Sequence, residues 1–60
     1  MIIELSEQEH ETLVELLEER LQMLRLEIIH TDSRNFKAIL QAREQLLESL
    51  HHRLAVHEHA

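Results

Sequence analysis

The stretch EIIHTDSRNF, residues 27–36, lies at the middle of the chain and separates two arms of helical periodicity. Its centre is rich in Thr, Asp, Ser and Asn, whose short polar side chains bond to nearby backbone and favour caps and turns. A single unbroken helix is the alternative, because no Gly or Pro forces a stop. In such a rod, however, the apolar stripe of the second arm would be rotated by roughly 80° from that of the first. The sequence therefore predicts a turn at 31–33 and an antiparallel helical hairpin.

Composition supports an all-α fold. The chain has 60 residues, lacks Cys, Gly and Pro, and has Phe36 as its only aromatic residue. Leu, Glu, Gln and Arg are abundant, and these residues suit helices better than strands. A domain this short buries only about 60% of the surface that its unfolded chain exposes. Without Cys a disulfide is excluded, so we expect a second chain to complete the core.

The charge and hydropathy of the chain restrict its partners. The formal net charge is −6 with His neutral, which disfavours binding to a nucleic-acid backbone. Uncharged runs are only a few residues long, far short of a membrane span. The first residues, MIIEL, lack the basic flank and apolar core of a signal peptide. We expect a soluble, cytoplasmic protein of bacterial origin without a membrane or nucleic-acid partner.

The first arm, about 7–30, begins with a capping box. Ser6 can accept a hydrogen bond from the Glu9 backbone, and the Glu9 carboxylate can accept one from the Ser6 N–H. One apolar stripe follows at helical spacing, and Leu16 and Met23 widen it to about half the circumference. The stripe comprises Leu13, Leu17, Leu21, Leu24 and Ile28.

The second arm is predicted at about 34–56, with Asp32 or Ser33 as its N-cap and a frayed tail at 57–60. Its apolar stripe has a heptad-like pattern, and Glu44 and Glu48 fall outside it. Arg43 is an exception, because it lies in the middle of the apolar stripe. The stripe comprises Phe36, Ile39, Leu40, Leu46, Leu47, Leu50 and Leu54.

These broad stripes predict oligomerisation. A lone hairpin leaves one side of each stripe in water, whereas two hairpins together bury both sides in an antiparallel four-helix bundle. Because most homo-oligomers are two-fold symmetric dimers, we expect a homodimer. A tetramer, or a different protein that supplies the missing helices, is the alternative.

Three charged residues, Arg20, Glu27 and Arg43, lie on or beside the apolar stripes. A charge on an apolar face must be paired or reach solvent. Glu27 is within reach of the Arg43 side chain across the hairpin, and a symmetry mate could equally supply the acid. We interpret the group as a polar contact that fixes the register. The alternative is an arginine site for a ligand carboxylate or phosphate.

The spacing Glu-x-x-His occurs three times, at 7–10, 27–30 and 48–51. In di-iron carboxylate bundles this spacing directs a carboxylate and an imidazole inward from one helix face. Here His30 lies off the first stripe, and Glu48 and His51 point away from the second. Only Glu7 and His10 are near a core-facing position.

The C-terminus adds more possible metal ligands, namely His51, His52, His57, Glu58 and His59. In an antiparallel hairpin the second arm ends beside the start of the first, so Glu7, His10 and His57 form the candidate metal site. The competing interpretation is a solvated, frayed terminus that binds nothing. We expect no cofactor.

The motif EIxxTD at 27–32, followed by Phe36, Lys37, Leu40, Arg43 and Leu46-Leu47, resembles a family of very short bacterial helical-hairpin proteins. The resemblance covers roughly positions 13–54. It implies the hairpin fold, and it implies that Glu27, Thr31, Asp32 and Arg43 shape the turn and the hairpin. No activity is attached to that family, so the resemblance implies nothing about catalysis.

The functional expectation is a non-enzymatic interaction or regulatory module. Enzymatic chemistry lacks support, because there is no Cys or Gly-rich loop and two of the three serines, Ser6 and Ser33, are explained as caps. A metal-binding, ferritin-like carboxylate bundle is the alternative. A less favoured alternative is an RNA-binding hairpin dimer similar to the plasmid copy-number proteins, whose basic RNA-reading face this acidic chain does not reproduce.

Overall fold

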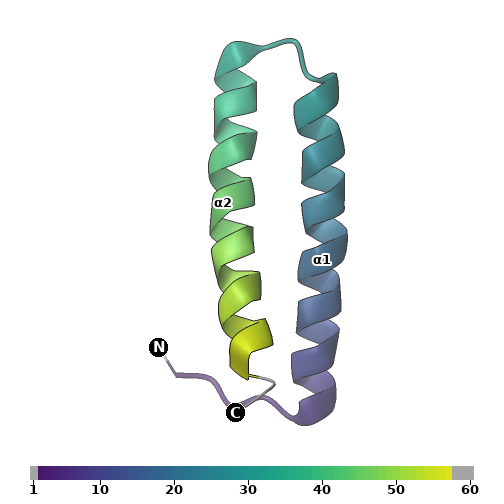
Figure 1. The fold of residues 1–60 in the computed structure, drawn as a ribbon, viewed down its shortest axis with the longest axis vertical. Helices are drawn as coiled ribbons and strands as arrows, with labels where there is room; N and C mark the ends of the chain where they lie inside the picture. Colours follow the sequence, from purple (N-terminus) through teal and green to yellow (C-terminus); the bar gives the residue numbers. More distant parts are fainter. Residues whose placement is uncertain (1, 58–60) are drawn as a thin grey trace.

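The chain folds into two antiparallel helices that lie side by side (Figure 1). The computed structural model describes the backbone of residues 2–57 and the side chains of residues 2–55. Helix α1 spans Glu7–His30 and helix α2 spans Arg34–His57, in a body of 40 × 20 × 17 Å. The predicted all-α hairpin is confirmed, with no strand in the described part of the chain. The tail was predicted at 57–60, but α2 continues to His57, and residues 58–60 lie outside the described residues.

Helix α1 begins at the predicted capping box. The Ser6 hydroxyl accepts a hydrogen bond from the Glu9 N–H at 3.1 Å, and the Glu9 carboxylate accepts one from the Ser6 N–H at 2.9 Å. Two of the backbone N–H groups that a helix start leaves unpaired are thereby satisfied. Just before the box, Ile3 and Leu5 line a hollow against the start of α1 together with Leu13 and Leu16.

The joint turns the chain without any residue at positive φ among the residues that the structure describes. Thr31 ends α1 in an extended conformation, φ −86° and ψ 136°, and its N–H donates to the Glu27 carbonyl at 2.9 Å. Ser33 then opens α2, because its hydroxyl accepts from the Phe36 N–H at 3.2 Å. Of the two expected N-caps, Ser33 is the one used. Extended backbone and a serine cap explain how the chain reverses without Gly.

A single row of apolar side chains forms the core between the helices. The buried members are Val14, Leu17, Leu21, Leu24 and Leu40. On α2, Leu40, Leu47 and Leu54 are spaced by seven residues, and this edge of the α2 stripe faces α1, with Leu40 buried and the other two half-buried. The rest of the α2 stripe does not take part. It remains on the surface, about half or more exposed at several positions.

Candidate interaction surface

The seam between the two helices has two sides of different chemistry. We call one the charged side, formed by Glu18 and Arg25 of α1 and Glu44, Glu48 and His51 of α2. We call the other the apolar side. It comprises Leu13, Leu16, Arg20 and Glu27 of α1 with Phe36, Ile39, Arg43, Leu46 and Leu50 of α2. These two surfaces are the main features that the fold offers for binding.

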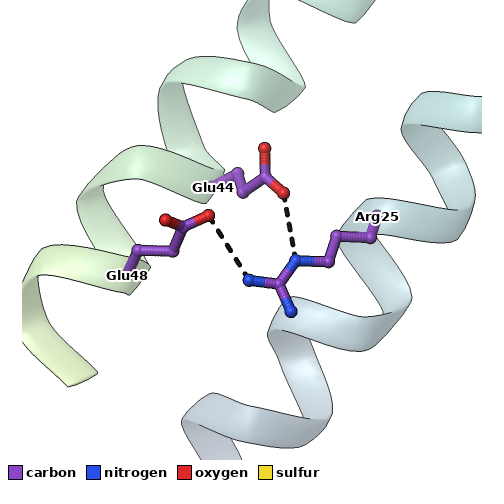
Figure 2. Close-up of polar contacts among 3 residues, drawn as sticks. All are labelled: Arg25, Glu44 and Glu48. Atoms are coloured by element: carbon purple, nitrogen blue, oxygen red, sulfur yellow. Dashed lines mark hydrogen bonds and ion pairs between the residues drawn. The ribbon is translucent and has the colours of Figure 1, made fainter. Parts of the chain in front are cut away.

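On the charged side, Arg25 bridges the two helices (Figure 2). Its Nε donates to Glu44 Oε2 at 3.2 Å, and its Nη2 donates to Glu48 Oε1 at 3.4 Å. Figure 2 shows the guanidinium of α1 directed at two carboxylates on successive turns of α2. The two acids are four residues apart and therefore lie on the same face of α2. One arginine thus holds two turns of α2 against α1.

A second contact between the helices lies further toward the open end of the charged side. His51 Nε2 and Glu18 Oε2 are 3.1 Å apart, so the imidazole N–H donates to the carboxylate. A hollow of about 550 Å³ lies between this pair and Arg25, also lined by Leu21, Gln22 and Glu48. The charged groups around it already pair with one another across the seam. The hollow is therefore a gap within a network of hydrogen bonds and ion pairs that links the two helices.

Sequence reasoning missed this network. It placed Glu48 and His51 away from the α2 stripe and did not anticipate that both contact α1. The stripe alone does not show which part of it faces α1. In fact its Leu40–Leu47–Leu54 edge faces α1, and this rotation brings Glu44, Glu48 and His51 to the seam. An arginine outside the α1 stripe, matched by two acids four residues apart on α2, was the available signal.

The apolar side carries the residues of the α2 stripe that do not face α1, and these residues are exposed to solvent. Leu46 is 72% exposed, and Phe36, Ile39 and Leu50 are each between about 40 and 55% exposed. Arg20 and Arg43 flank a hollow of about 280 Å³ whose other walls are Leu24, Leu46 and Leu47. Scattered exposed Leu residues are normal on a surface, but a contiguous row is typical of a binding face.

The structure brings together only part of the predicted polar contact of Arg20, Glu27 and Arg43. Arg20 and Arg43 do come together, at the hollow on the apolar side. The intrachain pair between Glu27 and Arg43 is not formed, since the ion pairs among the described residues involve only Arg25 and His51 with acids. At the joint, Thr31 caps α1 through its backbone, and Asp32 is exposed. A carboxylate from a second copy stays a prediction.

The candidate metal ligands are not assembled by the described part of the chain, which contains no cluster of three or more His, Asp or Glu suited to a metal ion. The His10 Nε2–H donates to the Leu54 carbonyl at 2.9 Å, so this nitrogen carries the proton. Leu54 lies in the last turn of α2, where carbonyls lack partners within the helix. His10 thus ties the two helices together at the open end of the hairpin. Glu7 is exposed, and the side chain of His57 lies outside the described residues.

Among the described residues, one group has a resolved pKa shift, and it belongs to the capping box. Hydrogen bonds from the Ser6 backbone and then from the Ser6 side chain lower the pKa of Glu9 below its ordinary value. The carboxylate also lies at the positive end of the α1 dipole. The shift therefore reflects helix capping.

Comparison with known proteins gives no independent indication of function. The chain matches no protein-family model, and no curated protein or solved structure is detectably similar to it. Within the described residues, neither helix is long and apolar enough to cross a membrane.

Proposed function

We propose that the protein is a non-enzymatic interaction module that binds a second copy of itself through the apolar side, giving an antiparallel four-helix bundle. The observation that carries this proposal is the row Phe36, Ile39, Leu46 and Leu50, which the fold leaves in water. Full burial of one such side chain contributes about 1.5–3 kcal/mol. Because these side chains are already partly covered, each gains a part of this contribution when two copies cover each other's row.

The surface area of the chain supports a partner of this size. The chain exposes 5334 Å², whereas a compact folded protein of 7.2 kDa is expected to expose about 4,100 Å². The excess is therefore about 1,200 Å², more than the roughly 800 Å² that each partner hides in a standard interface. Hiding such an area on each copy brings the exposed surface toward that of an ordinary folded protein.

The small core supports the same proposal. Only five apolar residues of the described chain are buried within one hairpin, and all lie in a single row between the helices. Two packed helices with one row of contacts resemble half of a bundle, because a four-helix bundle packs each helix against two neighbours. In the proposed dimer, each helix contacts its partner within the hairpin and one helix of the other copy.

The test is the mass of the protein in solution. At micromolar concentration, sedimentation equilibrium is expected to give twice the mass of one chain, and the melting temperature is expected to rise with protein concentration. Leu46→Glu is expected to weaken association by at least about 100-fold, because it places two carboxylates in an apolar interface. A wild-type protein with the mass of one chain under these conditions would contradict the proposal.

The chain offers a matched control for Leu46→Glu. Ile29 is exposed to the same extent as Leu46, 72% in each case. It lies four residues beyond Arg25 on α1, so it shares the charged side of the seam. Ile29→Glu adds the same charge and removes a similar apolar side chain, and it is expected to leave the dimer intact. Equal weakening by both variants would mean that the effect is not specific to the apolar side.

A further inference from the structure

Two cations lie on the apolar side, and the hairpin provides neither with an acid. Arg20 and Arg43 flank the same hollow, between Leu24, Leu46 and Leu47. Neither guanidinium forms a hydrogen bond or an ion pair with the residues that the structure describes. In a monomer this is tolerable, because both side chains are exposed to water. Once the face is covered, an unpaired charge becomes costly.

One anion, Glu27, shares this side of the seam. It lies seven residues, almost two full turns, beyond Arg20 on α1, so both project from the same face of the helix. Its side chain is exposed, and its carboxylate has no hydrogen-bond or ion-pair partner within the described chain. The apolar side thus presents unmatched charges of both signs, which is what a self-complementary surface requires.

The contacts across the seam fix the height of Glu27 relative to Arg43. Arg25 contacts Glu44 at 3.2 Å and Glu18 contacts His51 at 3.1 Å, so a rise of seven residues along α1 matches a descent of seven along α2. The same register places Glu27 level with about residue 42 of α2. Glu27 and Arg43 therefore lie at similar heights along the hairpin, within about one helical turn of each other.

A two-fold axis that runs along the seam preserves these heights. Rotation by 180° about such an axis puts α1 of one copy over α2 of the other, with both joints at the same end. The apolar rows then overlap over their full length, and Glu27 of each copy faces Arg43 of the other. An axis across the hairpin instead puts α1 over α1 and α2 over α2, where Arg43 no longer faces Glu27.

We infer that Glu27 of one copy binds Arg43 of a second copy, twice in each dimer, and that these pairs set the joints at the same end of the bundle. The inference rests on the proposed dimer. It adds the relative orientation of the two copies and a reason why the surface selects a second copy over other apolar partners. A planar guanidinium suits a carboxylate, and both groups lie beside apolar side chains that exclude water on assembly. The pairs discriminate against other apolar partners, because a helix without an acid at this height leaves Arg43 unpaired.

The test is a charge exchange between two variants. Glu27→Arg alone and Arg43→Glu alone each place like charges together twice in a homodimer, and each is expected to weaken association by at least about tenfold. In the mixed dimer every position 27 faces a position 43 of opposite charge. An equimolar mixture is therefore expected to form a heterodimer of nearly wild-type affinity, measured by native mass spectrometry. Circular dichroism of each variant checks that the hairpin remains helical.

Arg20→Glu is the matched control for orientation, since Arg20 has the same charge and lies on the same side of the seam. If Arg20→Glu rescues Glu27→Arg and Arg43→Glu does not, the inferred orientation is overturned. Wild-type association by both single variants, or no rescue in the mixture, also overturns it while the dimer proposal stands. A monomeric wild-type protein overturns both.

Cysteine cross-linking provides a readout that does not depend on charge. The chain has no Cys, so single substitutions at the two positions give unambiguous products. A mixture of Glu27→Cys and Arg43→Cys is expected to form the mixed disulfide on oxidation faster than a mixture of Glu27→Cys and Arg20→Cys. The reverse order overturns the inferred pairing, even if a charge variant fails to fold.

Discussion

The two sides of the seam use the same charged residue types with opposite results. On the charged side, the Arg25 guanidinium meets two carboxylates of the same chain. On the apolar side, Arg20 and Arg43 stand beside the exposed Leu46 and have no acid within the described chain. The fold therefore completes one side by itself and leaves the other incomplete. The incomplete side is the surface to which we assign the proposed second copy.

The energies of the two sides differ as well. An exposed ion pair contributes only about 0.2–1 kcal/mol, because water screens the charges and two long side chains lose freedom. Burial of a large apolar side chain contributes about 1.5–3 kcal/mol. The charged side thus adjusts how α2 is rotated against α1, and the apolar side contains most of the free energy still available for assembly.

The largest effect is expected in the core, on which both sides of the seam depend. Leu24 is 0% exposed, and Leu24→Ala is expected to cost about 2–5 kcal/mol through lost burial and the cavity it leaves. A small hairpin cannot absorb such a loss. We expect the variant to be largely unfolded at 25 °C even before urea is added, which circular dichroism during a urea titration measures. The ion pairs of the charged side and the apolar side are then lost together.

Leu46→Ala tests the difference between the core and the apolar side, because it removes the same side-chain atoms as Leu24→Ala but from an exposed position. At concentrations where the chain is monomeric, the cost is expected to stay within about 0.5 kcal/mol, since the side chain is already in water. Where the dimer forms, the cost is expected to rise to about 2 kcal/mol or more. Equal costs at both concentrations would mean that Leu46 stays exposed after assembly.

Much of the fold could be predicted from sequence because its signals are local. The capping box needs only Ser6 and Glu9, and the turn needs only the polar residues around Thr31. On α1 the stripe is regular, and its buried members Leu17, Leu21 and Leu24 are among those expected. A repeat of three and four residues identifies a helix face with little ambiguity.

The rotation of α2 could not be predicted in the same way. Its stripe is broad enough to be centred on Arg43 or on the Leu40–Leu47–Leu54 edge, and periodicity does not choose between them. The choice depends on contacts between distant residues, such as Arg25 with Glu44, that no single helix encodes. Sequence also left open whether Glu27 of the same chain or of a second copy pairs with Arg43, and the intrachain pair is not formed.

A smaller effect is expected at the capping box, which belongs to neither side of the seam. Ser6→Ala removes the hydroxyl that accepts from the Glu9 N–H, and it is expected to lower the free energy of unfolding by about 1 kcal/mol. The dimer interface is expected to be unaffected at equal folded fraction. A loss of association beyond that caused by unfolding would mean that the start of α1 takes part in the interface.

The same box gives the hairpin an acid-sensitive contribution of known sign. The pKa of Glu9 is lowered by the Ser6 backbone hydrogen bond and then by the Ser6 side chain. Because the pKa of Glu9 is lower in the folded state, the ionised carboxylate stabilises the folded hairpin. This contribution is complete at pH values above the unfolded-state pKa, and it is lost as the pH falls through the folded-state pKa. In Glu9→Gln this part of the acid slope is expected to disappear from the pH dependence of the melting temperature. If the pH dependence of the melting temperature in acid is the same in Glu9→Gln as in the wild type, carboxylates other than Glu9 are responsible for it.

The smallest effect is expected on the charged side. Arg25→Met keeps most of the aliphatic stem and removes both ion pairs, so the expected loss is about 1 kcal/mol or less. Double-mutant cycles with Glu44→Gln and Glu48→Gln are expected to give the larger coupling for Glu44. Its contact is shorter, 3.2 Å against 3.4 Å, and its side chain is less exposed, 21% against 50%. Both couplings are expected to shrink as salt is added.

The dimer is expected to survive Arg25→Met, because the network it removes is internal to one hairpin. Arg43→Glu, on the other side of the seam, is expected to weaken the homodimer by at least about tenfold while leaving the monomeric hairpin folded. The two arginines thus separate folding from assembly. If Arg25→Met dissociated the dimer and Arg43→Glu did not, the second copy would have to bind over the charged side, and the roles assigned to the two sides would be exchanged.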